Sequence, residues 1–185
     1  LNHYIQHRIE PNDPQLDDQW WHINDVSGGG VVDADIDTDQ AWEITTGGVT
    51  ALGDTIVVCV VDDGGALDHP DLMANNWVNR HEIPNNNIDD DNNGYVDDYL
   101  GWNPVDDNDN VDGGSHGVNV AGMIGAVGNN GTGVVGVNWN VKIMNMTYGS
   151  LGSGNNPNEA NVIEAYTYPL VIRRQYEETN CAFGA

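Results

Sequence analysis

The chain has 185 residues, with 29 acidic against 5 basic side chains and a formal net charge of −24 at pH 7. This charge excludes a general nucleic-acid or anionic-membrane binder, because both functions need clustered lysine and arginine. A hydrophobic content of 39% with 6 tryptophans excludes wholesale disorder, and the length allows one domain with its own core. Carboxylates in such excess repel one another, and divalent cations are the obvious means of neutralising them.

The chain offers few signals at its ends. Residues 1–10 show no periodicity and are expected to run extended over the surface.

The cysteines, Cys59 and Cys181, are predicted to stay unpaired, since Cys59 lies in an apolar strand and behaves there as a small hydrophobe. No stretch approaches the ~20 apolar residues of a membrane-spanning helix. The chain starts at Leu1 without a signal peptide, so we expect a processed or cropped sequence.

The first predicted elements are a short helix and a buried strand. The helix is expected over residues 39–44, ended by two glycines. An unbroken apolar run over residues 56–61 is typical of a strand buried on both faces of a parallel α/β sheet. Asp62 follows at the carboxyl end of this strand, where such sheets gather ligands and catalytic groups. The irregular, acidic stretch 75–114 is too long for a compact domain unless it is functional or held by ligands.

The sequence of the second half of the chain predicts two helices and two strand segments. Small and apolar residues over 115–127 favour a closely packed central helix, because the glycines among them would weaken a solvent-exposed helix. Strand segments are expected over 134–137 and 141–146. A last helix is expected over 158–176, kinked or divided at Pro169. The fold class is therefore α/β, with a mostly parallel sheet and helices on both faces.

Three ordered motifs carry a family resemblance. Residues 60–64 read Val-Val-Asp-Asp-Gly, residues 69–72 His-Pro-Asp-Leu, and residues 116–122 His-Gly-Val-Asn-Val-Ala-Gly. Together they resemble the aspartate and histidine blocks of the subtilisin-like serine peptidases, and the resemblance extends over roughly Asn12–Met146. It implies a subtilisin-like fold truncated to its N-terminal portion, with residues 11–185 in the catalytic domain and residues 1–10 as an arm or propeptide tail. It also implies a secreted endopeptidase.

The resemblance implies two catalytic residues. His116 matches the general base, and Asp62 matches the carboxylate that orients it. Asp62 ends a predicted strand, and His116 opens a predicted helix. The alternative is structural: Asp62 merely ends its strand, and His116 makes a local hydrogen bond at a helix end. Asp63 stands where the family usually has Ser or Thr, and Val118 and Asn119 replace the usual Thr and His. These departures remove no proton carrier, but they alter hydrogen bonds around the site.

The family's nucleophile block, Gly-Thr-Ser-x-Ala, and its oxyanion asparagine have no match in this sequence. The serines present are Ser27, Ser115, Ser150 and Ser153, and Ser115 adjoins His116 in a poor geometry for proton transfer. Without a positioned nucleophile we expect the chain to be inactive alone, and to act on a peptide or protein substrate only when completed. The alternative is a non-catalytic calcium-binding or assembly module with a degenerate subtilase fold. An exposed sheet edge would favour self-association.

The segment 89–98 follows the pattern D-x-D-x-N-G-x-x-D. Oxygen ligands at alternate positions, with glycine sixth, are the first two-thirds of an EF-hand-type Ca²⁺ loop. Leu100 stands at the twelfth place and no helices flank the loop, so it is not an EF-hand. It is similar to a calcium loop of some subtilases, and the alternative is a solvated acidic loop. The expected ligands are the side chains of Asp89, Asp91 and Asn93, the Tyr95 carbonyl, and Asp97 or Asp98.

A second calcium site is implied by the resemblance alone. Many subtilases bind calcium between a residue near the mature N-terminus, the aspartate of His-Pro-Asp-Leu, and a loop that interrupts the histidine helix. These places match Asp13, Asp71 and the loop from Asn130, with Thr132 and Val134 offering carbonyls. The loop is one residue longer than in the shortest family members, which leaves the individual ligands open.

Overall fold

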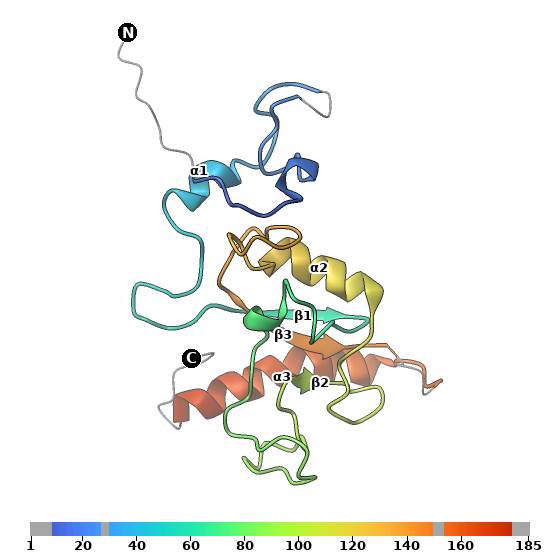
Figure 1. Cartoon of the computed structure of the whole chain (residues 1–185). Helices are drawn as coiled ribbons and strands as arrows, with labels where there is room; N and C mark the ends of the chain where they lie inside the picture. Colours follow the sequence, from blue (N-terminus) through green and yellow to red (C-terminus); the bar gives the residue numbers. More distant parts are fainter. Residues whose placement is uncertain (1–8, 27–29, 150–153, 179–185) are drawn as a thin grey trace.

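The computed structural model describes residues 9–26, 30–149 and 154–178 (Figure 1). Its helices are α1 (Thr38–Trp42), α2 (Ser115–Gly125) and α3 (Glu159–Glu178), and its strands are β1 (Val57–Asp62), β2 (Gly101–Trp102) and β3 (Lys142–Thr147), with short 3₁₀ turns at Leu16–Asp18 and Met73–Asn75. Most of the expected N-terminal arm and Cys181 lie outside the described residues. Cys59 is a free thiol. No helix in the described ranges is long and apolar enough to cross a bilayer.

The three strands form one parallel sheet in the order β1-β3-β2. Val57 lies opposite Lys142 and Asp62 opposite Thr147, so β1 and β3 pair along their whole length. Parallel neighbours need a crossover connection, and α2 supplies it between β2 and β3. The carboxyl ends of β1 and β3 consequently meet at one edge, and Asp62 lies there.

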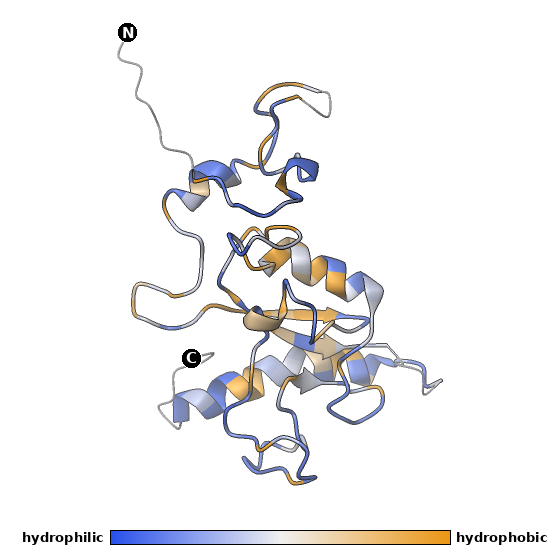
Figure 2. Ribbon diagram, viewed as in Figure 1, coloured by the Kyte–Doolittle hydropathy of each residue, from blue (hydrophilic) through white to orange (hydrophobic). Residues whose placement is uncertain are grey.

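A helix covers each face of the sheet, as Figure 1 shows for α2 and α3. Val60 and Ile143 pack with Ala121 of α2 on one face. Met144 and Met146 pack with α3 on the other. Because both faces are covered, β1 is apolar up to its last residue, Asp62, and Figure 2 shows the strand in hydrophobic colour. The predicted α/β architecture with a parallel sheet is confirmed.

One local prediction is wrong and a second is wrong in part. Residues 134–137 are not a strand, because the Gln19 side chain pairs with the backbone of Val135, donating to its carbonyl and accepting from its N–H at 2.8 Å each. Pro169 does not divide the last helix, since α3 is continuous through it. Buried residues on either side of the proline, Ala165 and Ile172, pack into one core cluster and hold both halves of α3.

Candidate active site and metal site

The first candidate site lies where β1 ends and α2 begins. Asp62 is the last residue of β1, and His116 is the second residue of α2. The chain leaves β1 through Gly64, whose φ of 121° suits glycine. A side chain at Gly117 would overlap the Gly64 carbonyl oxygen, so the helix start and the strand tip touch through backbone. This close approach sets the two side chains side by side.

Asp62 and His116 are within hydrogen-bonding distance of each other. The His116 Nδ1 atom lies 2.8 Å from Asp62 Oδ1 and 2.9 Å from Oδ2. An ionised carboxylate only accepts, so Nδ1 carries the proton and Nε2 is left with a lone pair. Asp62 Oδ1 also accepts the Asp63 N–H at 2.8 Å, which fixes the carboxylate plane. A neutral imidazole held in this way can accept a proton at Nε2, as the general-base role predicted for His116 requires.

The pair shifts both pKa values in the directions expected of an ion pair. The hydrogen bond and the charge of Asp62 raise the pKa of His116, whose side chain is 74% exposed. Burial alone would raise the pKa of Asp62, but the hydrogen bonds from His116 and the Asp63 N–H outweigh it, and the pKa is lowered. Asp62 therefore remains a carboxylate over the range in which His116 titrates.

The described serine, Ser115, is the first residue of α2, next to His116 in the chain. The other three serines, Ser27, Ser150 and Ser153, lie outside the described residues.

The acidic segment 89–98 is folded around its own hydrogen bonds. Asp89 accepts the backbone N–H groups of Asn93 and Gly94 at 3.1 and 2.9 Å. Asp91 accepts the Asn93 N–H at 3.1 Å, and Asn93 accepts the Tyr95 N–H at 2.7 Å. The carboxylates and amide at alternate positions are thus held on one turn. Their assignment as calcium ligands stays a prediction.

The structure separates the two aspartates that the sequence left as alternatives. Asp97 accepts the N–H groups of Asn86 and Asn87 at 3.0 and 2.8 Å, and so fastens the loop to a neighbouring segment. Asp98 is fully buried and receives hydrogen bonds from Asn93 at 2.9 Å and Tyr168 at 2.8 Å. Asp98 is therefore the one that faces inward.

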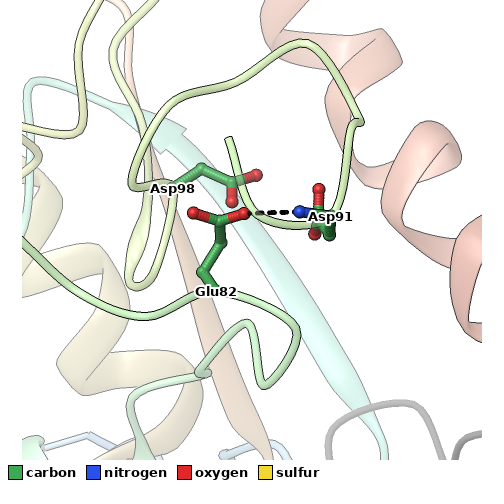
Figure 3. Close-up of side chains that lie close together, drawn as sticks. All are labelled: Glu82, Asp91 and Asp98. Atoms are coloured by element: carbon green, nitrogen blue, oxygen red, sulfur yellow. Dashed lines mark hydrogen bonds between the residues drawn. The ribbon is translucent and has the colours of Figure 1, made fainter. Parts of the chain in front are cut away.

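The inward-facing carboxylate belongs to a cluster that sequence reasoning missed. One oxygen each from Glu82, Asp91 and Asp98 lies within 4.8 Å of the other two, and Figure 3 shows the three side chains converging. Glu82 is 5% exposed, and its Oε1 accepts the Asp91 N–H at 3.1 Å. Its Oε2 is buried and meets no donor from the described residues. Glu82 lies outside the loop pattern, and no signal in the spacing marks it.

Burial dominates the electrostatics of this cluster. It raises the pKa of Glu82 to about 7, and the charges of Asp91 and Asp98 add to the rise. It also raises the pKa of Asp98 to about 6, although hydrogen bonds from Asn93, Asn79 and Tyr168 oppose it. A buried carboxylate oxygen without a donor, next to two further carboxylates, fits a hard cation that prefers oxygen ligands. The residues present therefore suit an oxygen-binding divalent cation, to which Glu82 would add a ligand.

The second predicted calcium site is also brought together in space. Asp13 accepts the Asn129 N–H at 2.6 Å and the Asn130 N–H at 3.3 Å. Asp71 accepts from the Asn130 side-chain amide at 2.8 Å and from the Val134 N–H at 2.9 Å. The remaining predicted residue, Thr132, donates its N–H to the Asn130 side chain at 2.7 Å. Both carboxylates hold the loop by hydrogen bonds, and a cation here stays a prediction.

Comparisons with known proteins bear on the first site. A model of the subtilase family matches residues 53–176, a range that contains both Asp62 and His116. The chain belongs to the subtilase family. Subtilisin-like protease 1 of Plasmodium berghei is 46% identical over 108 residues, which are 57% of this chain and 18% of the relative. Human neuroendocrine convertase 2 is 32% identical over 136 residues, or 73% of this chain and 18% of the relative.

The fold is shared with a solved serine protease as well. The serine protease of Aeromonas sobria, solved in complex with its chaperone, aligns with a TM-score of 0.60 at 23% identity, over 89% of this chain and 24% of that chain. The chain thus spans about a fifth of the length of these relatives. The subtilase fold and the family predicted from the three motifs are confirmed.

Proposed function

We propose that this chain forms the base-bearing part of a serine endopeptidase, with His116 as general acid and base and Asp62 as the carboxylate that orients it. The nucleophile would come from a Gly-Thr-Ser block outside these 185 residues, so the chain alone would not hydrolyse peptides. The observation that carries the proposal is the 2.8 Å contact between His116 Nδ1 and Asp62 Oδ1 at the tip of β1.

His116 and Asp62 would have different roles in that reaction. His116 Nε2, left unprotonated by the contact at Nδ1, would take the proton of an attacking hydroxyl and later return it to the leaving amine. The imidazolium formed in between would be stabilised by Asp62, whose pKa is lowered and which therefore stays charged. Asp62 would move no proton itself.

A chimera tests this proposal. The corresponding segment of the Plasmodium berghei relative is replaced by residues 53–176 of this chain, the range that matches the family and contains both Asp62 and His116. The chimera should cleave the relative's peptide substrates, and His116→Ala should lower kcat/KM by at least about 10⁴-fold, because the base and its proton transfer are lost.

The control is Asp68→Asn, which removes a carboxylate from an exposed position without touching the pair. This variant should keep the rate of the parent chimera. A chimera that folds but cleaves nothing, or that cleaves equally well with His116→Ala, would contradict the peptidase proposal and favour a non-catalytic calcium-binding or assembly module.

We further propose that Ca²⁺ stabilises the protein through Glu82, Asp91 and Asp98 together with the loop 89–95. The support is the buried Glu82 Oε2 without a donor, beside carboxylates that repel one another in the absence of a cation. We place the complete protein outside the cell, where calcium is abundant enough for sites of moderate affinity. This placement rests on the proposed metal site and on the family.

Calcium removal tests the metal proposal. A ligand present at 100 times its Kd adds about 2.7 kcal/mol to the free energy of unfolding. For a chain of this length, each kcal/mol raises the Tm by about 2–4 °C. Excess EDTA should therefore lower the Tm by about 5–10 °C, and re-added CaCl₂ should restore it. Glu82→Gln should remove most of this difference, whereas Glu159→Gln, in the first turn of α3, should preserve it. A Tm unaffected by EDTA would contradict the proposal.

A further inference from the structure

The start of α2 lacks the usual side-chain cap. Its N-cap is Gly114, which has no side chain to accept a hydrogen bond, and no acidic residue lies in the first turn. The first N–H groups of any helix have no partner within the helix. In α2 those groups belong to the turn that carries His116, so their partners decide how firmly the imidazole is positioned.

Asp63, the residue after β1, supplies the missing acceptors from 53 and 54 residues away in sequence. Its Oδ1 accepts the Gly117 N–H at 2.7 Å, and its Oδ2 accepts the His116 N–H at 3.2 Å. An anion at a helix N-terminus is also favoured by the helix dipole. A single carboxylate at the end of β1 thus binds two successive backbone groups of α2.

The neighbouring aspartates divide the contacts to His116 between them. Asp62 holds the ring through Nδ1, and Asp63 holds the backbone of the same residue. The Asp63 N–H in turn donates to Asp62 Oδ1, so the Asp62 carboxylate is held against the backbone of Asp63. A side chain at Gly114 would overlap Asp63, which shows how closely the strand tip and helix start are packed.

We propose that Asp63 is a positioning residue, which clamps the first turn of α2 to the end of β1 and thereby holds the His116 imidazole against Asp62. A catalytic role for this clamp rests on the proposed function. The contacts between Asp63 and α2 do not depend on peptide hydrolysis. Among the described residues, the charges that act on the His116 imidazole are those of Asp62 and Asp63, both at the carboxyl end of β1. Both charges raise the pKa of His116, and Asp62 has the larger effect.

NMR titration of the His116 imidazole in the 185-residue chain tests the clamp. Asp63→Asn removes the charge but keeps one acceptor oxygen, whereas Asp63→Ala removes both. The His116 pKa should therefore fall in the order wild type, Asp63→Asn, Asp63→Ala, because the last variant also loosens the contact between His116 and Asp62. Asp68→Asn is the matched charge control and should leave the His116 pKa at the wild-type value.

Amide hydrogen exchange adds a second readout. In Asp63→Ala the Gly117 amide should exchange about tenfold faster, the effect expected for loss of a helix cap, while the Gly125 amide in the last turn should not change. If Asp63→Ala fails to fold, Asp63→Ser, whose hydroxyl keeps one acceptor, takes its place and should give intermediate exchange.

Two results would overturn the clamp. Equal His116 pKa values in the Asn and Ala variants would mean that Asp63 acts only through its charge. Faster Gly117 exchange with an unchanged His116 pKa would mean an ordinary helix cap without influence on the imidazole. Neither reading requires hydrolysis, so failure of the clamp and failure of the peptidase proposal remain distinguishable.

Discussion

At the scale of single residues, the behaviour of the carboxylates depends on contacts far away in sequence. The prediction that Asp62 and His116 lie together came from the family motifs, and it agreed with their places at a strand end and a helix start. The role of Glu82 could not, because only the folded chain brings its oxygen beside Asp98. The sequence could not show which of Asp97 and Asp98 joins the acidic cluster either. That depends on hydrogen bonds from Asn86 and Asn87 to Asp97 and from Tyr168 to Asp98.

The ion pair between Asp62 and His116 makes stability depend on pH. The pKa of His116 is raised on folding, so its contribution is complete below the unfolded value of 6.5 and is lost as the pH rises through the folded pKa. The pKa of Asp62 is lowered, so its contribution is present above 3.8 and is lost as the pH falls through the folded pKa.

The stability gap between wild type and His116→Ala should therefore be largest between these two limits, near pH 5, and shrink above neutral pH. Urea unfolding of both proteins from pH 4.5 to 9 measures the gap. A difference that stays constant over this range would show that the contact is not an ion pair in solution.

At the scale of elements, apolar periodicity was the most reliable guide. Both long strands and both long helices lie where hydrophobic runs and spacing placed them, because α2 and α3 cover the two faces of the sheet. The pattern failed at residues 134–137, where an apolar run pairs with a glutamine side chain, and no local pattern encodes such a partner. The two-residue strand β2 is too short to give a periodic signal.

The glycines of α2 should respond differently to alanine. At Gly117 a Cβ would overlap the Gly64 carbonyl oxygen, whereas at Gly122 nothing lies within 4 Å. Gly122→Ala should therefore stabilise the chain by about 0.5–1 kcal/mol through helix propensity. Gly117→Ala should destabilise it, because backbone must move apart at the junction of β1 and α2.

Unfolding midpoints in urea compare the two variants directly, and each serves as the other's control. Equal stabilisation by both substitutions would contradict the close packing of the strand tip against the helix start.

At the scale of the whole molecule, the acidic composition and the fold are connected. A formal charge of −24 opposes compaction, and several carboxylates are held by backbone N–H groups, as Asp13, Asp71 and Asp97 show. Glu82 and Asp98 are the carboxylates whose burial raises the pKa most clearly, and the proposed calcium site lies there. The long acidic stretch 75–114 is thus organised by its own hydrogen bonds and packed against α3 through Tyr168.

The most direct test of the central claim is the rate of the chimera with Asp62→Asn. The substitution keeps the shape of the side chain but allows its amide to favour the wrong imidazole tautomer, so kcat/KM should fall by about 10⁴-fold while Asp68→Asn keeps the parental rate. Hydrolysis by the Asp62→Asn chimera at the parental rate would contradict the assignment of Asp62 and His116 as the working pair of a peptidase.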